Sequence, residues 1–335
     1  MFRNRLRGNA AGRTLPRMIR LDGVAREYGG WIARARQRVV RALDGVTLHV
    51  PPGTAMGIVG PNGAGKSTLI RLLLGYIRPT AGSIAIDGAE PRAYVTRRGV
   101  AYVPEVVAIR PSFTVSHAMR VFAALAELPE AATRTAAALE RVGMAGAVDR
   151  RIGALSKGML QRVAIAQALL GDRRVMVLDE PTSGLDPEWI AELRVIVAEW
   201  RAADPARVVL IASHDLDELE RTADRVAVLQ NGRLREVIDL KAPALRFPAY
   251  RLEVESTPHA GEAVRACFPD AVAEEGPDLA FRVQPADAED LNRRVAELLK
   301  RGVVVHALAP ERETLEQRFH GTVGRQRDGG RGKGR

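Results

Sequence analysis

The chain contains a single cysteine and no long apolar run, and each shortage excludes a class of protein. Cys267, alone among 335 residues, can form no internal disulfide and is too little thiol for a cysteine zinc site. No stretch approaches about 18 consecutive apolar residues, so we expect no segment that crosses a bilayer by itself. The basic N-terminus lacks the apolar core of an export signal. These absences together predict a cytosolic chain.

Lysine is also scarce, with five residues against 45 arginines, and the net charge of +10 is unevenly distributed. Residues 1–41 hold a net charge of +9 and residues 325–335 a net charge of +4, which leaves −3 for residues 42–324. Blocks of like charge are usually solvated arms. The alternative is adhesion of these ends to an anionic surface, either a cytoplasmic leaflet or nucleic acid. The slightly acidic body argues against nucleic acid as the main partner.

Short apolar runs alternate with helix-length segments through the first two thirds of the chain. The runs lie at 46–50, 54–60, 100–103, 174–178, 207–212 and 225–229. Strands that alternate with helices predict an α/β domain with a mainly parallel sheet. The Ala- and Leu-rich stretch 114–171 shows no clear strand, so it predicts an inserted helical subdomain at about 105–170. The length of the chain allows a second domain.

The second domain is predicted at 249–320, after a linker at 241–248, and the basic segments 1–17 and 321–335 flank the two domains. Its apolar pattern reads as βαββαβ, an α+β sandwich. The strand residues expected to face the helices are Tyr250, Leu252, Val254, Leu279, Phe281 and Val283, and the helical stripes are Val264, Cys267, Phe268 and Leu291, Val295, Leu298, Leu299. No cluster of His, Cys and carboxylates accompanies them. We therefore expect a regulatory or dimer-supporting module.

A glycine-rich motif follows the run at 54–60. Its residues Gly60-Pro61-Asn62-Gly63-Ala64-Gly65-Lys66-Ser67, followed by Thr68, fit the pattern G-x-x-x-x-G-K-[ST]. Glycines let backbone N–H groups curl around phosphate oxygens, and the N-terminus of the following helix adds positive potential. Lys66 is suited to neutralise the β- and γ-phosphates of a nucleotide, and the Ser67 hydroxyl to bind Mg²⁺. The motif predicts ATP and Mg²⁺ as ligands.

A second motif, VMVLDEP at 175–181, supplies acidic groups for the same chemistry. An apolar strand that ends in Asp179 brings a carboxylate close to Mg²⁺. Glu180 follows directly, and it could polarise the water that attacks the γ-phosphate. An acidic pair after a strand is by itself more often a helix cap, but the phosphate loop favours the catalytic reading.

Together with these two motifs, further segments make residues 18–240 resemble the ATP-binding cassette ATPases. Leu155-Ser156-Lys157-Gly158-Met159 resembles the family signature LSGGQ, whose serine and glycine contact the γ-phosphate held by a second subunit. The resemblance implies an ATP sandwich between two copies of the chain. It also implies site residues outside the two motifs: Ser156 and Gly158 in the signature, Asp186 in the D-loop, His214 as the switch histidine and Tyr28, with Trp31 as a substitute, against adenine.

The chain departs from the family pattern in three places. Lys157 and Met159 replace a glycine and a glutamine of the signature. Glu105 stands where many members carry a glutamine that links Mg²⁺ to the membrane partner, and a carboxylate can still bind the metal. The segment Gly29–Arg41 is about nine residues longer than the family pattern and rich in arginine.

The variants at Glu105 and in the signature resemble ATPase subunits of drug, antibiotic and lipid exporters whose membrane subunit is a separate chain. This resemblance implies a peripheral position on the inner face of the cell membrane. A soluble cassette ATPase acting on nucleic acid or ribosomes is the alternative, although the second cassette, coiled coil or zinc cysteines of such proteins are missing from the sequence. A small-molecule kinase would share the phosphate loop but would not explain the signature, D-loop and His214 together.

Overall fold

The computed structural model describes residues 18–29, 39–241, 248–274, 279–311, 315–316 and 318–319. It divides into two compact units between Leu240 and Lys241, and each is described by itself. The basic arms predicted at 1–17 and 321–335, Trp31 with most of the arginine-rich segment, and most of the predicted linker lie outside the described residues.

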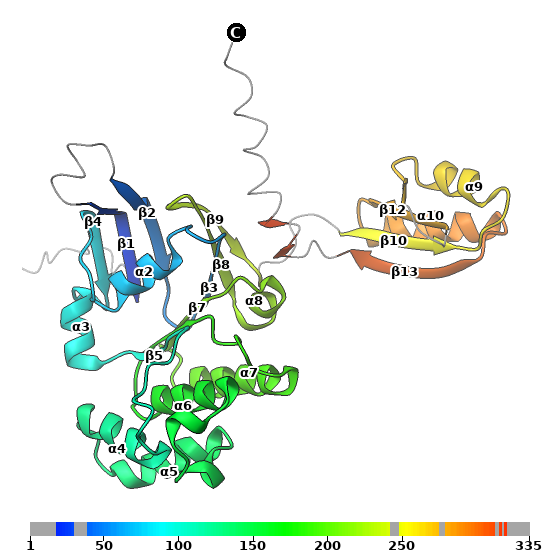
Figure 1. Ribbon diagram of the computed structural model, residues 1–335. Coiled ribbons are helices and arrows are strands. Elements are labelled where there is room, and N and C mark those ends of the chain that lie inside the picture. Colours follow the sequence, from blue (N-terminus) through cyan, green and yellow to red (C-terminus); the bar gives the residue numbers. More distant parts are fainter. Residues whose placement is uncertain are drawn as a thin grey trace, which may run out of the picture. The chain divides into compact units, whose positions relative to one another are not determined.

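A six-stranded sheet forms the centre of the larger unit (Figure 1), with strand order β5-β6-β7-β3-β8-β9. Every neighbouring pair is parallel except β8 and β9, which form an antiparallel edge. The α/β class with a mainly parallel sheet is therefore confirmed. The strands are β3 (Ala55–Val59), β5 (Ala101–Val103), β6 (Val175–Asp179), β7 (Val208–Ala212), β8 (Arg225–Gln230) and β9 (Arg233–Asp239).

A second, antiparallel sheet with order β2-β1-β4 packs in the same unit. The sequence pattern indicated only the end of β2 (Val40–Val50), and it missed β1 (Ile19–Tyr28) and β4 (Ala81–Ile86). Three register shifts in the β1–β2 pairing explain the miss of β1, because each shift breaks the alternation of apolar and polar residues. β4 reads AGSIAI, and its alanines and glycine have little strand propensity.

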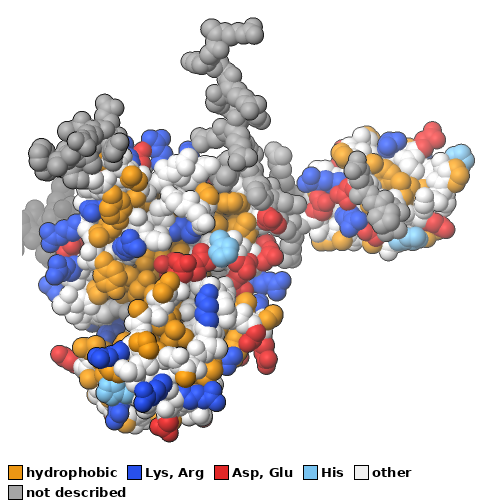
Figure 2. All heavy atoms as spheres, in the orientation of Figure 1, with side chains coloured by type: hydrophobic (Ala, Val, Ile, Leu, Met, Phe, Trp, Pro, Cys, Tyr) orange, Lys and Arg blue, Asp and Glu red, His pale blue; other side chains and the backbone are white. Residues whose placement is uncertain are grey.

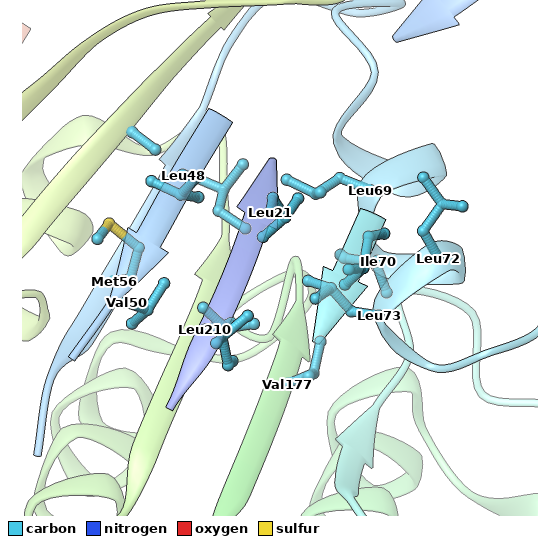
Figure 3. Close-up of a cluster of buried hydrophobic side chains, with 14 of the residues drawn as sticks. Leu21, Leu48, Val50, Met56, Leu69, Ile70, Leu72, Leu73, Val177 and Leu210 are labelled. Atoms are coloured by element: carbon cyan, nitrogen blue, oxygen red, sulfur yellow. The ribbon is translucent and has the colours of Figure 1, made fainter. Parts of the chain in front are cut away.

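The main core lies between the two sheets and helix α2 (Lys66–Leu73). Figure 3 shows the side chains of Leu21, Leu48 and Leu210, from three different strands, near Leu69 and Ile70 of α2. All of these side chains are almost fully buried. This packing holds the first turn of α2 in a fixed position against the end of β3, and the phosphate loop connects these two elements.

The predicted helical stretch contains α4 (Val115–Leu125), α5 (Ala131–Arg141), two short 3-10 turns (Ala145–Ala147 and Ile152–Ala154) and α6 (Lys157–Leu169). The sheet helices of the same unit are α3 (Pro91–Arg98), α7 (Pro187–Ala202) and α8 (Leu216–Thr222). Among the described residues, no helix combines the length and the apolar character that a membrane span requires.

The smaller unit is a βαββαβ sandwich with sheet order β11-β12-β10-β13 and antiparallel pairing throughout. Leu252, Phe281 and Leu298 are buried in its own core. One predicted core residue is wrong, because the Leu299 side chain is 52% exposed on the outer face of its helix. The elements are β10 (Ala249–Val254), α9 (Ala260–Cys267), β11 (Val272–Glu274), β12 (Leu279–Val283), α10 (Ala288–Lys300) and β13 (Val305–Glu311).

Candidate functional site

The glycine-rich loop joins the end of β3 to the start of α2. A Cβ on Gly60 would lie 2.2 Å from the Leu229 carbonyl oxygen, and one on Gly65 would lie 2.6 Å from the Ala42 carbonyl oxygen. Gly65 also has φ +107°, a left-handed conformation that side chains disfavour. These positions require glycine because backbone from two other strands closes around the loop.

The Lys66 ammonium lies over this loop. Its Nζ donates a hydrogen bond of 2.6 Å to the Gly60 carbonyl oxygen, and α2 begins at the same residue. The neighbouring Ser67 is exposed, while Thr68 is buried beneath the helix. A lysine cation, a free hydroxyl and the N–H groups of a helix start therefore surround one small space, which is suited to phosphate oxygens.

Asp179 ends β6 beside this space, and it is buried, with 8% of its surface exposed. Burial and, to a smaller degree, the nearby Glu105 and Glu180 carboxylates raise the pKa of the Asp179 carboxyl to about 6, against a smaller opposing effect of Lys66. Three carboxylates thus concentrate negative charge near a largely buried position. A cation bound here would lower this electrostatic cost.

Glu180 and His214 form a hydrogen-bonded pair at the ends of two neighbouring strands. Glu180 Oε2 and His214 Nδ1 lie 2.8 Å apart, and the Glu180 side chain is 13% exposed against 76% for His214. Glu180 has φ 46°, a strained conformation for a residue other than glycine. Its backbone N–H donates to the Ala212 carbonyl oxygen at 2.8 Å, which fixes the residue between β6 and β7.

These groups line one cavity of about 750 Å³ at the carboxyl ends of β3, β6 and β7. Figure 2 shows acidic side chains beside a histidine on the face of the larger unit that it presents. Most residues predicted from the sequence meet here: Tyr28, Gly60, Pro61, Asn62, Gly63, Ala64, Gly65, Lys66, Ser67, Thr68, Glu105, Asp179, Glu180 and His214.

The remaining predicted residues, Ser156, Gly158 and Asp186, are not part of this lining. Ser156 caps α6 by accepting a hydrogen bond of 3.2 Å from the Met159 N–H. Asp186 caps α7 by accepting one of 2.8 Å from the Trp189 N–H. The chain therefore keeps its signature segment apart from its own phosphate loop.

The cavity also includes residues that sequence reasoning missed: Val40, Arg41, Ala42 and Ser183. Arg41 is held by two ion pairs, 2.9 Å from Glu27 and 3.0 Å from Asp44. No sequence motif marks Val40 or Arg41. They reach the cavity only because β2 pairs with β1, which is a contact between segments that the sequence does not show. Ser183 could have been noticed, since it is the first residue of the segment Ser183-Gly184-Leu185-Asp186 that resembles the D-loop, in which only Asp186 was assigned a site role.

A strand, a glycine-rich loop and a helix, with a buried aspartate on a neighbouring strand, define a P-loop nucleotide-binding protein. The sequence profile of the ABC transporter family matches residues 43–183. The chain is similar to "Nod factor export ATP-binding protein I" of Paraburkholderia xenovorans (strain LB400), with 33% identity over 310 residues, 83% of this chain and 96% of the relative. The chain belongs to the ABC transporter family.

Two further likenesses support this assignment. A protein of the same name from Burkholderia pseudomallei (strain 1710b) is 39% identical over 201 residues, which cover 57% of this chain and 64% of the relative. A solved structure described as the ATP binding subunit of an ABC transporter has 30% identity and a TM-score of 0.58, covering 67% of this chain and 90% of that one. Both likenesses agree with a cassette in the larger unit.

The raised pKa of Asp179 predicts a pH-dependent stability. Between pH about 4 and about 6 the folded chain holds this proton more tightly than the unfolded chain, so the stability of the nucleotide-free protein falls as pH rises through that window. Asp179→Asn cannot ionise, so we expect it to raise the unfolding temperature at pH 8. Each pH unit is worth about 1.4 kcal/mol, which limits the gain to about 3 kcal/mol.

The measurement is thermal unfolding without nucleotide from pH 4 to pH 8. The advantage of Asp179→Asn should become small at the acidic end, where the folded wild-type carboxyl is protonated and the unfolded one begins to bind its proton as well. Asp149→Asn, at an exposed position of the helical stretch, is the matched control and should show no such trend. A lower unfolding temperature of Asp179→Asn at pH 8 would contradict the argument.

Proposed function

We propose that this ABC ATPase subunit drives export across a membrane by closing and reopening a dimer around ATP. The observation that carries the proposal is the single cavity in which the phosphate loop, Asp179 and the Glu180–His214 pair meet. The names of the relatives, export ATP-binding proteins, support the direction of transport. The alternative, a cassette acting on nucleic acid or ribosomes, has no comparable support.

ATP binds with its phosphates over the glycine-rich loop, where Lys66 exchanges its bond to the Gly60 carbonyl for phosphate oxygens. Tyr28, at the cavity wall, packs against the adenine ring. Among the described residues, no three His, Cys, Asp or Glu side chains are grouped closely enough to hold a metal by themselves. This fits Mg²⁺, which is commonly bound by one or two carboxylates together with substrate phosphates.

Ser67, Asp179 and Glu105 are the residues that would hold Mg²⁺, since all three offer the hard oxygen atoms that this ion prefers. When bound, the ion supplies charge neutralisation for the phosphates. Glu180 accepts a proton from the attacking water, and His214 holds the Glu180 carboxylate in place through their 2.8 Å contact. The strained backbone of Glu180 is consistent with such a role.

A second copy of the chain completes each site. Ser156, at the N-terminus of α6, and Gly158 do not line the nucleotide cavity of their own chain, which supports a role at the nucleotide of the partner copy. Asp186 lies on the same surface, next to α6, where Arg162 pairs with it at 3.6 Å. A helix N-terminus stabilises negative charge, which suits it to cap a γ-phosphate from the opposite side.

The partner in the membrane docks in a groove of the larger unit. A cavity of about 270 Å³ lies between α3, β5 and the helices α4 and α6, lined by apolar residues that include Val95, Phe122 and Leu170. Leu125, which also lines this cavity, is 78% exposed and adds apolar surface next to it that a partner could cover. The occupant that we propose is an apolar segment of the transmembrane subunit, which export requires and which the described helices do not provide.

Leu125→Glu should leave ATP turnover by the isolated chain unchanged and abolish co-purification with the membrane subunit. The introduced carboxylate would have to be buried without a partner. Leu299→Glu makes the same change at an exposed leucine of the smaller unit and should co-purify like the wild type. Retained co-purification of Leu125→Glu, or equal loss with Leu299→Glu, would reject the groove as the docking site.

The other segments contribute to assembly. The smaller unit has its own core and contributes none of the described lining of the nucleotide cavity, which supports a regulatory or dimer-supporting module rather than a second catalytic site. The basic ends, with net charges of +9 and +4, would hold the chain against the anionic inner leaflet of the membrane. Both features fit a peripheral position on the cytoplasmic face of an exporter.

A further inference from the structure

The N-terminus of α6 is joined by side chains to the segment that follows Glu180. Lys157 Nζ donates a hydrogen bond of 2.8 Å to Ser183 Oγ, and Gln161 Nε2 donates one of 3.3 Å to the Pro181 carbonyl oxygen. Next to Gln161, the Arg162 guanidinium stacks on the Trp189 ring, 3.7 Å from its centroid. The first two turns of the helix are thus connected to the segment 181–189 by three side chains.

The side chain of Lys157 packs closely against the backbone at Gly184. The side-chain stem lies directly over Gly184, where a Cβ would come within 2.6 Å of Lys157 Cδ. A Cβ on Gly158 would in turn lie 3.1 Å from the Gly184 carbonyl oxygen, so helix and segment pack backbone against backbone. Gly184 has φ +82°, a turn that directs the chain under the lysine stem. The absence of a side chain at Gly184 is what makes room for Lys157.

Ser183 connects this contact to the catalytic carboxylate. Its N–H donates a hydrogen bond of 3.2 Å to the Glu180 carbonyl oxygen, which closes the turn after Glu180, and Ser183 lines the nucleotide cavity. Lys157 therefore touches a residue of the cavity in its own chain, while the adjacent Ser156 belongs to the surface that we assign to the partner's nucleotide. Neither the phosphate-loop motif nor the signature resemblance gives Lys157 such a role.

We propose that Lys157 is a positioning residue that couples the two ATP sites of the dimer through Ser183. When the partner's nucleotide draws the start of α6 inward, Lys157 moves Ser183 and the turn that carries Glu180 with it. A hydrogen bond from an ammonium to a hydroxyl can transmit this shift, because the bond is short and the packed stem restricts movement of the Lys157 side chain relative to Ser183. The inference rests on the proposed function, in which Glu180 activates water and Ser156 serves a second copy.

A double-mutant cycle of Lys157→Met and Ser183→Ala in the full-length chain tests the coupling. Methionine keeps the length of the stem and removes the ammonium. Each single variant should lower kcat for ATP by about three- to tenfold, the range expected for the net contribution of one solvent-accessible hydrogen bond, and leave KM within about twofold. The double variant should be no slower than either single variant. Lys157→Arg should recover most of the rate, and Lys300→Met, at an exposed lysine of α10, should behave as wild type.

Two outcomes would overturn the proposal. If Lys157→Met is slow and Ser183→Ala is not, or if their effects multiply, Lys157 acts on another group such as the partner's phosphate. If neither variant alters kcat, no coupling exists. Hydrogen exchange of the amides at 182–186 without nucleotide provides a second readout, and both variants should speed it while leaving β6 protected. This second readout does not depend on turnover. If the wild-type chain had no ATPase activity, the proposed function would be refuted, but hydrogen exchange would still test the contact between Lys157 and Ser183.

Discussion

Glu180→Gln should bind ATP with wild-type affinity and hydrolyse it at least about 100-fold more slowly, the lower end of the range for loss of a general base. The change removes a proton-accepting carboxylate and leaves Lys66 and Ser67 intact. A group that acts only in the transition state affects kcat far more than binding. The amide keeps the size of the side chain, and its contact with His214 can persist as a neutral hydrogen bond.

Phosphate release and equilibrium binding of a fluorescent ATP analogue are the measurements for this variant. Glu140→Gln makes the same change on the exposed face of α5 and should match the wild type in both. The Glu180→Gln chain should also accumulate as an ATP-bound dimer on size exclusion, because closure no longer ends in hydrolysis. Turnover within a few fold of the wild type would remove Glu180 from the catalytic role.

Ser156→Arg should abolish ATP hydrolysis although Ser156 does not line the cavity of its own chain. The arginine occupies the place where the partner's γ-phosphate docks. The loss of the helix cap itself should cost only about 1 kcal/mol of stability, so the variant should still fold. Ser156→Ala removes the cap without adding bulk, and it separates these two effects.

Mixing restores activity if the site is shared. A heterodimer of Ser156→Arg and Lys66→Ala chains contains one site with an intact phosphate loop facing an intact signature. In an equal mixture, random pairing makes half of the dimers heterodimers, and each heterodimer has one working site out of two. The mixture should therefore recover about a quarter of the wild-type rate. No recovery on mixing, or full activity of Ser156→Arg alone, would reject the shared site.

Sequence reasoning located those parts of the site that lie in contiguous motifs. The run from Gly60 to Thr68, the Asp179–Glu180 pair and His214 each follow an apolar strand, and the carboxyl ends of neighbouring parallel strands meet at one edge of the sheet. Their meeting in one cavity therefore follows from local pattern and a general topological rule. The parallel sheet and the βαββαβ order of the smaller unit were also predictable, because the order of strands and helices follows from local apolar patterns.

The rest depends on contacts between segments far apart in the chain. β1 carries Tyr28 to the cavity, but its bulged pairing with β2 conceals the strand from any test of alternation. Arg41 reaches the cavity wall only through that pairing. The Lys157–Ser183 bond joins residues 26 positions apart, and nothing in the sequence signals it beyond a lysine where the family pattern has glycine. Side-chain partners across helices and turns require the fold itself.

The structure of the Glu180→Gln chain with ATP and Mg²⁺ tests the central claim most directly. We predict two copies related by a twofold axis, with each ATP held between residues 60–68 of one copy and Ser156 of the other. Mg²⁺ should lie beside Ser67 and Asp179, in contact with the β- and γ-phosphates. A nucleotide bound outside this cavity, or contacted by one copy alone in the closed state, would contradict the account.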